Sequence, residues 1–396
     1  MLVNGARQTG KTTLARQIAG QEMRYLTLDD AATFSAADAD PVGFIEGLGE
    51  PAVIDEVQKV PALLPAIKGS VDRQRSPGRF LLAGSADVLM LPTVSESLAG
   101  RVEPITLWPL SQGELAGVEE SFVDALFATR TPRWPAEGAS RDALVGRALR
   151  GGFPPAVQRS DARRRDRYAA YVTTIVQRDI RDLADVVHVA QLPRLLSLLA
   201  ARSTSLLNTA ELSRSTGIAH TTLQRYLVLL EQAFLLRMIP AWSSNRSKRL
   251  VKSPKVGLVD SGLAAHLAGV TSARLRSDPS SAGPQLEGFV AGELRKQLGW
   301  AKARADLFHF RTHGGREVDL VLEHDDGRIT GIEVKASASV DDGDFKGLRV
   351  LQEEAAGRFV RGVLLYTGSE ALSFGSGLQA LPLGCLWNVH RPTVRA

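Results

Sequence analysis

Glycine, lysine and threonine residues near the start of the chain have the spacing of a phosphate-binding loop. Residues 5–13 read G-A-R-Q-T-G-K-T-T, which fits the pattern G-x-x-x-x-G-K-S/T. In such a loop the backbone N–H groups surround phosphates, a lysine reaches the β- and γ-phosphate oxygens, and a hydroxyl binds Mg²⁺. The sequence therefore predicts contacts with ATP from Gly5, Gln8, Thr9, Gly10, Lys11, Thr12 and Thr13, with Thr12 also on the metal.

Further candidates for catalysis follow other apolar runs. Asp55 is expected to hold Mg²⁺ through water, and Glu56 to orient or deprotonate the attacking water. Ser85 is either a sensor of the γ-phosphate or a helix N-cap. Arg101 is either an arginine finger or sensor that stabilises transition-state charge, or a surface arginine. With Lys11, these residues predict hydrolysis of ATP.

The elements that must position these residues follow from the spacing of apolar runs. Up to about residue 115, short apolar runs alternate with helical patterns, which predicts a parallel sheet covered by helices, with its ligand at the carboxyl ends of the strands. Residues 205–242 indicate a helix-turn-helix followed by a strand. Thr221, Gln224 and Arg225 are expected on the outer face of its second helix, where they contact DNA or belong to a protein-packing module.

Alternating apolar and charged residues predict a hairpin late in the chain, with strands over residues 317–323 and 328–335. If Val318, Leu320 and Leu322 share one face with Ile332 and Val334, then Leu320 lies opposite Ile332. The same register sets Asp319 opposite Glu333, with Lys335 beside Glu333, and Glu287 on the preceding helix can join them. This group suits a Mg²⁺-dependent phosphodiesterase. The alternative is a solvated hairpin face with Glu317 and Lys335 paired.

Composition limits the class and the location of the protein. A chain of 396 residues with 44% hydrophobic residues is long enough for two or three domains. The single cysteine, Cys385, suits a reducing cytosol. With no membrane-spanning run and no signal peptide, a cytoplasmic protein without membrane contact is expected. Basic residues gather at 163–167 and 246–255, where they attract polyanions or form a solvated face.

The motifs together resemble a group of bacterial and archaeal AAA-type ATPases that carry a C-terminal domain of unknown function. The resemblance covers nearly the whole chain and rests on GARQTGKTTL, VIDEVQ, LAGSADVLM, SLAGRVEPITLWPLSQGEL, GGFPPAV, VGLVDSGL, EGFV, EVDLVLE and GIEVKAS. It implies a final domain similar to the PD-(D/E)xK restriction-endonuclease-like fold, with Glu287, Asp319, Glu333 and Lys335 as its acidic and lysine positions. Members usually carry a few dozen residues ahead of the P-loop, whereas here Gly5 nearly opens the chain, which implies a truncated amino terminus or weaker recognition of adenine.

The expected fold is α/β and multidomain. It comprises an AAA-type P-loop ATPase domain over residues 1–115, a helical domain over 116–204, a winged-helix-like region over 205–276 and an α/β restriction-endonuclease-like domain over 277–396. The expected function is Mg²⁺-dependent ATP hydrolysis coupled to DNA binding or processing, of which a nuclease gated by ATP is a narrower form. The alternative is a nucleotide-switched scaffold for DNA or a partner protein, with a degenerate nuclease-like domain. AAA domains often place an arginine at a neighbour's nucleotide, so a homo-oligomer is compatible with either function.

Overall fold

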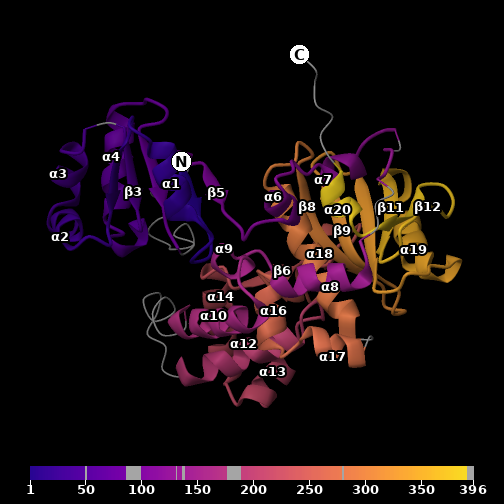
Figure 1. The fold of residues 1–396 in the computed structure, drawn as a ribbon. Helices are drawn as coiled ribbons and strands as arrows, with labels where there is room; N and C mark the ends of the chain where they lie inside the picture. Colours follow the sequence, from indigo (N-terminus) through magenta and orange to yellow (C-terminus); the bar gives the residue numbers. More distant parts are fainter. Residues whose placement is uncertain are drawn as a thin grey trace. The chain divides into compact units, whose positions relative to one another are not determined.

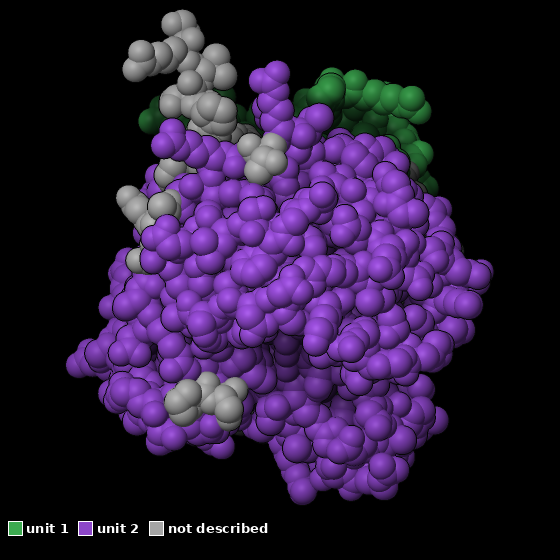
Figure 2. Space-filling model, turned by 90° about the vertical axis from the view of Figure 1, so that its right-hand side faces the viewer, with its two compact units in different colours: residues 1–109, 174–187, 225–235 green, residues 110–173, 188–224, 236–396 purple. Residues whose placement is uncertain are grey.

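The structure is a computed structural model that describes residues 1–49, 51–85, 100–130, 132–135, 139–175, 189–278 and 281–389. The chain divides into two compact units, which are coloured separately in Figure 2. Unit 1 comprises residues 1–109, 174–187 and 225–235, and unit 2 comprises residues 110–173, 188–224 and 236–396. Residues 86–90 and 97–99, which belong to two of the motifs above, lie outside the described residues.

A five-stranded parallel sheet forms the centre of unit 1 (Figure 1). Its strands are β1 (Leu2–Asn4), β2 (Arg24–Thr27), β3 (Ala52–Asp55), β4 (Phe80–Ala83) and β5 (Pro104–Thr106), in the order β2-β3-β4-β1-β5. Every pairing is parallel, so the expected parallel sheet is confirmed. Because the strands are parallel, their carboxyl ends lie on the same side of the sheet, and so do the residues that follow β1 and β3.

Helices cover both faces of this sheet, which is why its central strands β1, β3 and β4 are buried along their whole length. The described helices are α1 (Lys11–Ala19), α2 (Ala31–Ala39), α3 (Pro41–Glu46), the 3₁₀ helix η1 (Val57–Lys59) and α4 (Leu63–Arg73). The core cluster beneath α1 contains Val3, Ala15, Ala19, Val53 and Leu81. The cluster beneath α4 contains Leu2, Ile54, Leu63, Leu64, Ile67 and Leu82.

Unit 2 contains a helical part and a two-stranded antiparallel sheet of β6 (Leu236–Ile239) and β7 (Lys255–Leu258). Its helices up to α17 are α6 (Gln112–Ala116), α7 (Phe122–Leu126), α8 (Arg141–Arg150), α9 (Pro154–Val157), α10 (Asp161–Thr174), η4 (Val189–Gln191), α12 (Leu192–Ala201), α13 (Thr209–Thr216), α15 (Arg246–Val251), α16 (Ser261–Leu267) and α17 (Ser272–Ser277). Helix α13 ends at Gly217, whose φ of 73° is left-handed, and α14 (His220–Gln232) follows. The helices and the strand expected over residues 205–242 are therefore present.

A six-stranded mixed sheet forms the rest of unit 2, in the order β12-β13-β11-β10-β9-β8 (Figure 1). Its strands are β8 (Ala305–Arg311), β9 (Glu317–His324), β10 (Ile329–Lys335), β11 (Phe359–Tyr366), β12 (Leu372–Ser373) and β13 (Leu378–Pro382). Strands β10, β11 and β13 run parallel, and the other neighbours are antiparallel. Leu320 pairs with Ile332, so the expected hairpin register is confirmed.

The mixed sheet packs between α18 (Ala282–Leu298) on one face and α19 (Lys346–Ala355) on the other. The remaining helices are η6 (Asp342–Phe345), η7 (Ala356–Arg358) and α20 (Cys385–Asn388). Leu320, Leu322, Ile332 and Val334 pack in the core cluster that contains α18. Val318 was expected with them but packs beneath α19, because β9 has one extra residue between Val318 and Val321 relative to β8, and this bulge turns Val318 to the other face. Among the described helices, none is both long and apolar enough to cross a membrane.

Candidate functional site

The expected phosphate-binding loop connects β1 to α1. Gly5 has a φ of 145°, and a Cβ at this position would lie 2.3 Å from the carbonyl oxygen of Leu107. The Lys11 Nζ donates to the carbonyl oxygens of Gly5 and Ala6 at 3.0 and 2.7 Å, so its ammonium lies over the loop. The amino end of a helix leaves N–H groups without intrahelical partners. Together with the ammonium, these groups can hold phosphates.

The remaining loop residues shape this connection. Gln8 has a φ of 68° and Gly10 a φ of 104°, so both are left-handed. The Thr9 hydroxyl donates to the Ala6 carbonyl oxygen at 3.0 Å and is buried. Thr13 is exposed in the first turn of α1. The two left-handed residues and the Thr9 hydrogen bond shape the turn between β1 and α1.

Thr12 and Asp55, the two residues expected to hold Mg²⁺, lie side by side. The Thr12 hydroxyl donates to Oδ2 of Asp55 at 2.8 Å, and Asp55 is 2% exposed. Sequence reasoning missed Tyr25, whose hydroxyl donates to the same Oδ2 at 2.7 Å. Burial and this hydrogen bond raise the pKa of Tyr25. The sequence offered only a phenol on β2, the strand beside β3.

Glu56 and Ser85 also come together. Glu56 has a φ of 59°, a left-handed conformation that costs a non-glycine residue about 1–3 kcal/mol and is common at active sites. The Ser85 hydroxyl donates to Oε2 of Glu56 at 3.3 Å, and Gln58 Nε2 donates to both side chains, reaching Ser85 Oγ at 3.0 Å. Gln58 was missed as a site residue, although it closes the VIDEVQ motif. Three polar side chains therefore meet here: Glu56 and Gln58 follow β3, and Ser85 follows β4.

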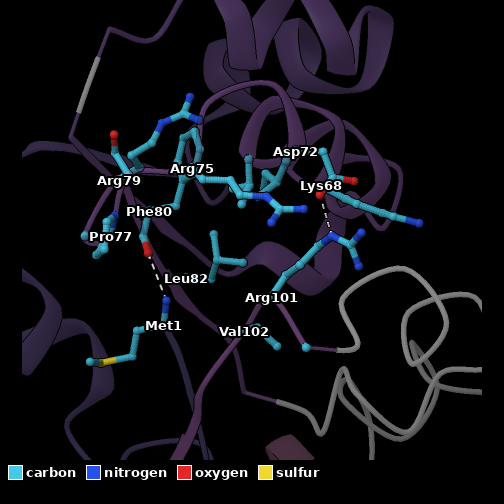
Figure 3. A pocket seen from close by; sticks show the side chains of 15 residues that line it. Met1, Lys68, Asp72, Arg75, Pro77, Arg79, Phe80, Leu82, Arg101 and Val102 are labelled. Carbon is cyan, nitrogen blue, oxygen red and sulfur yellow. Dashed lines mark hydrogen bonds and ion pairs between the residues drawn. The ribbon is translucent and has the colours of Figure 1, made fainter.

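Arg101 is not brought to this group. Its Nε donates to Oδ1 of Asp72 at 2.6 Å (Figure 3). It lines a hollow of about 480 Å³ with Met1 and Arg79, which come just before β1 and β4. These residues lie at the amino ends of the strands, whereas Asp55 lies at a carboxyl end. Within one chain, Arg101 therefore lies at the opposite ends of the strands from the phosphate-binding loop.

A second group of charged side chains surrounds Lys255 of β7 in unit 2. Its Nζ lies 2.7 Å from Oε1 of Glu287 on α18 and 3.5 Å from Oδ1 of Asp319 on β9. Glu333 on β10 shares a side-chain hydrogen bond with Asp319, and the Val334 N–H donates to Oδ2 of Asp319 at 3.0 Å. The structure thus brings the three expected carboxylates together. It places among them an ammonium that sequence reasoning had assigned to a basic surface run.

Burial dominates the electrostatics of this carboxylate cluster. It raises the pKa of Glu287 to about 7, and the negative charge of Asp319 adds to the shift. Burial and Asp319 likewise raise the pKa of Glu333 well above its ordinary value. Burial alone would lower the pKa of Lys255, but Glu287 and Asp319 outweigh it, so the pKa of Lys255 is raised. Lys255 therefore stays charged at neutral pH and neutralises part of the cluster.

Lys335 pairs with Asp344 of η6 rather than with the cluster. The alternative pairing of Glu317 with Lys335 is also wrong, because Glu317 lies 3.6 Å from Arg311. No three His, Cys, Asp or Glu side chains within the described ranges are arranged to hold a metal ion. With Lys255 between its carboxylates, the cluster does not fit the metal centre that the family resemblance implies.

The basic run at residues 246–255 is only partly a surface. Lys255 is 5% exposed, and the guanidinium of Arg249 pairs with both oxygens of Glu323 and lies 5.1 Å from the ring centroid of Phe308. Arg246 and Lys248 are exposed. The run is therefore not one continuous surface, whether for a polyanion or for solvent, because Arg249 and Lys255 pair with acidic side chains.

A phosphate-binding loop on a parallel sheet, with an adjacent threonine and aspartate, is the arrangement of a P-loop nucleotide-binding domain. Residues 1–116 match the model of a family described as AAA domain. Residues 141–274 and 282–386 match two domains of unknown function, DUF8612 and DUF4143. Uncharacterized proteins of Mycobacterium tuberculosis and Mycobacterium bovis are each 35% identical over 344 residues, which cover 86% of this chain and 70% of either relative. The chain belongs to the family of these two proteins.

Proposed function

We propose that the protein binds ATP with Mg²⁺ and hydrolyses it. The observation that carries this proposal is the 2.8 Å contact of the Thr12 hydroxyl with Asp55, next to the Lys11 ammonium. A hydroxyl and a carboxylate so placed fit Mg²⁺ that is also bound by phosphates and water, and Mg²⁺ supplies charge neutralisation of the phosphates. Lys11 binds the β- and γ-phosphate oxygens. Tyr25 keeps the Asp55 carboxylate oriented towards Thr12.

Glu56 orients and deprotonates the attacking water in this proposal. Its carboxylate is held by Ser85 and Gln58, so the base is positioned before a substrate arrives. Ser85 can in turn contact the γ-phosphate through its hydroxyl. Arg101 would serve the nucleotide of a neighbouring copy in a homo-oligomer, because it lies at the amino edge of its own sheet.

Coupling to DNA is the second part of the proposal. Thr221, Gln224 and Arg225 are exposed on α14, which follows α13 after a turn at Gly217, as in a helix that enters the major groove. In the proposed organisation, residues 116–204 form a helical domain, 205–276 a winged-helix-like region and 277–396 a restriction-endonuclease-like domain. In this proposal the protein is cytoplasmic.

A second candidate function is a nucleotide-switched scaffold, and the position of Lys255 favours it. An ammonium 2.7 Å from Glu287 neutralises carboxylates that a nuclease would use for metal. The restriction-endonuclease-like domain would then be degenerate and would bind DNA or a partner protein without cutting it. Metal-dependent cleavage of DNA by the purified protein, abolished in Asp319→Asn, would refute this second function.

The proposed ATPase is tested by phosphate release from ATP, with and without double-stranded DNA. We expect Glu56→Gln to slow release by about a hundredfold or more, because it removes the base. Glu22→Gln is a matched control, since Glu22 is an exposed glutamate of the same unit and should leave the rate unchanged. If the parent protein binds nucleotide but does not hydrolyse it, the ATPase is refuted and the nucleotide-switched scaffold remains. If the parent protein binds no nucleotide, both functions are refuted.

A further inference from the structure

Four helices of unit 2 line an open hollow of about 580 Å³, which we call the arginine pocket. Its walls come from α8, α10, α16 and α17, and its charged and aromatic lining is Arg150, Asp161, Arg164, Arg165, Tyr168, His266 and Arg276. All of these except Arg276 lie within residues 141–274, the stretch that matches a domain of unknown function. The volume lies in the usual range for small-molecule sites, roughly 300–1,000 Å³.

The lining of the arginine pocket carries positive charge that the protein does not neutralise. Its single acid, Asp161, is 2.7 Å from Arg164, which also donates to the carbonyl oxygen of Arg159 at 2.6 Å. In the part of the chain that the structure describes, the guanidinium groups of Arg150, Arg165 and Arg276 have no acidic partner. Like charges around one hollow repel each other, so an anion bound there would be stabilised by all three.

Two aromatic side chains, Tyr168 and His266, form the floor of the pocket. The Tyr168 hydroxyl donates to Oδ1 of Asp260 at 3.0 Å and lies 3.1 Å from the Arg150 carbonyl oxygen. The rings of Tyr168 and His266 are 5.9 Å apart. Burial and the charge of Arg165 lower the pKa of His266, so its imidazole is neutral at pH 7. This aromatic floor can pack against a planar group while the arginines bind charge.

We propose that the arginine pocket binds a phosphorylated small molecule of nucleotide size. A guanidinium group can donate two parallel hydrogen bonds to two oxygens of one phosphate, and it remains charged at any physiological pH. Arg164 is fixed by Asp161 and backbone carbonyls, whereas Arg150, Arg165 and Arg276 are exposed and able to turn towards a phosphate. The aromatic floor and the apolar side chains of Leu149 and Val270 suit a base or sugar. This site is separate from the phosphate-binding loop of unit 1.

The test uses the full chain with Lys11→Ala, which weakens phosphate binding at the loop of unit 1. Titration calorimetry would measure the binding of ADP, of pyrophosphate and of a short DNA duplex. We expect Arg165→Gln with Arg276→Gln to weaken ADP binding by about tenfold or more, because two charge-assisted contacts are lost. The matched control is Arg163→Gln with Arg274→Gln, which removes two exposed charges from the same two helices outside the pocket and should change little.

Each outcome decides the proposal. Equal affinities for pyrophosphate and ADP would support a site that binds the phosphates without contacting the base. A higher affinity for ADP would support a nucleotide site. Equal losses in the two double variants would overturn the proposal, because the effect would then come from overall charge. Binding of the DNA duplex alone, or of no probe, would also overturn it. Thermal unfolding of both variants would show that they remain folded.

Discussion

At the scale of single residues, burial decides what the charged side chains of this protein can do. Asp55 and Lys255 are both nearly inaccessible, yet one accepts hydrogen bonds from two hydroxyls and the other lies among carboxylates. A buried charge is stable only when partners replace the water that it loses. The consequence differs between the two sites. Asp55 is held by hydroxyl groups next to a phosphate-binding loop, while Lys255 neutralises acids that would otherwise repel one another.

Lys255→Met should strongly destabilise unit 2. The substitution keeps an unbranched side chain that is one atom shorter, but it leaves Glu287 and Asp319 without their cation. The loss of one partner from a buried ion pair costs about 3–5 kcal/mol. Urea unfolding at pH 7, followed through the fluorescence of the buried Trp242 and Trp387, measures the change. Adding Glu287→Gln should recover part of the loss, because it removes a charge that the cation had balanced. A cost below about 1 kcal/mol would mean that water reaches the carboxylates.

The pKa of Glu287 predicts how stability depends on pH. Burial raises this pKa from 4.5 to about 7, so the folded protein keeps a proton that the unfolded chain releases near pH 4.5. The free energy of unfolding should therefore fall as pH rises between these values, by on the order of 3 kcal/mol for this group. Glu287→Gln should remove that part of the slope in urea titrations. Glu353→Gln, at an exposed position on α19, should not.

At the scale of elements, the sequence predicts what is local and misses what crosses between elements. The strand, loop and helix around Lys11 follow from a nine-residue pattern, and the pairing of Leu320 with Ile332 follows from period-two alternation. Lys255 lies 64 residues from Asp319 in sequence, within a run of basic residues that looks like a surface. Nothing local marks it as buried. Tyr25 is similar, because it reaches Asp55 only once β2 pairs with β3.

Gly5→Ala tests whether β5 and the phosphate-binding loop are tightly packed. The new Cβ would lie 2.3 Å from the Leu107 carbonyl oxygen at a φ of 145°, so loop or strand must shift, at a cost of about 2 kcal/mol or more and with loss of ATP binding. Thermal unfolding and nucleotide titration measure both effects. Gly69→Ala in α4 is the matched control, because the site is open and alanine should stabilise that helix by up to about 1 kcal/mol. Equal stability of the two variants would show that the loop adjusts freely.

At the scale of the whole molecule, the carboxyl ends and the amino ends of the parallel strands in unit 1 carry different candidate residues. Lys11, Thr12, Asp55 and Glu56 are at the carboxyl edge, and Arg101 is with Asp72 at the amino edge. An arginine that stabilises transition-state charge must reach the γ-phosphate. If Arg101 has this proposed role, it must act on the nucleotide of a second copy, and ATP hydrolysis and oligomer formation should then be linked.

Mixing two inactive variants tests this link. Arg101→Ala retains its own Glu56, and Glu56→Gln retains its own Arg101, so a mixed oligomer contains interfaces with one complete set of groups. We expect each variant alone to release phosphate at least about a hundredfold more slowly than the parent, and the equimolar mixture to recover a substantial part of the rate. Asp72→Asn is the control for loss of the Arg101 ion pair, which joins partly exposed side chains and should contribute little to stability. A mixture no faster than its components would show that Arg101 does not act between copies, and full activity of Arg101→Ala alone would remove it from catalysis.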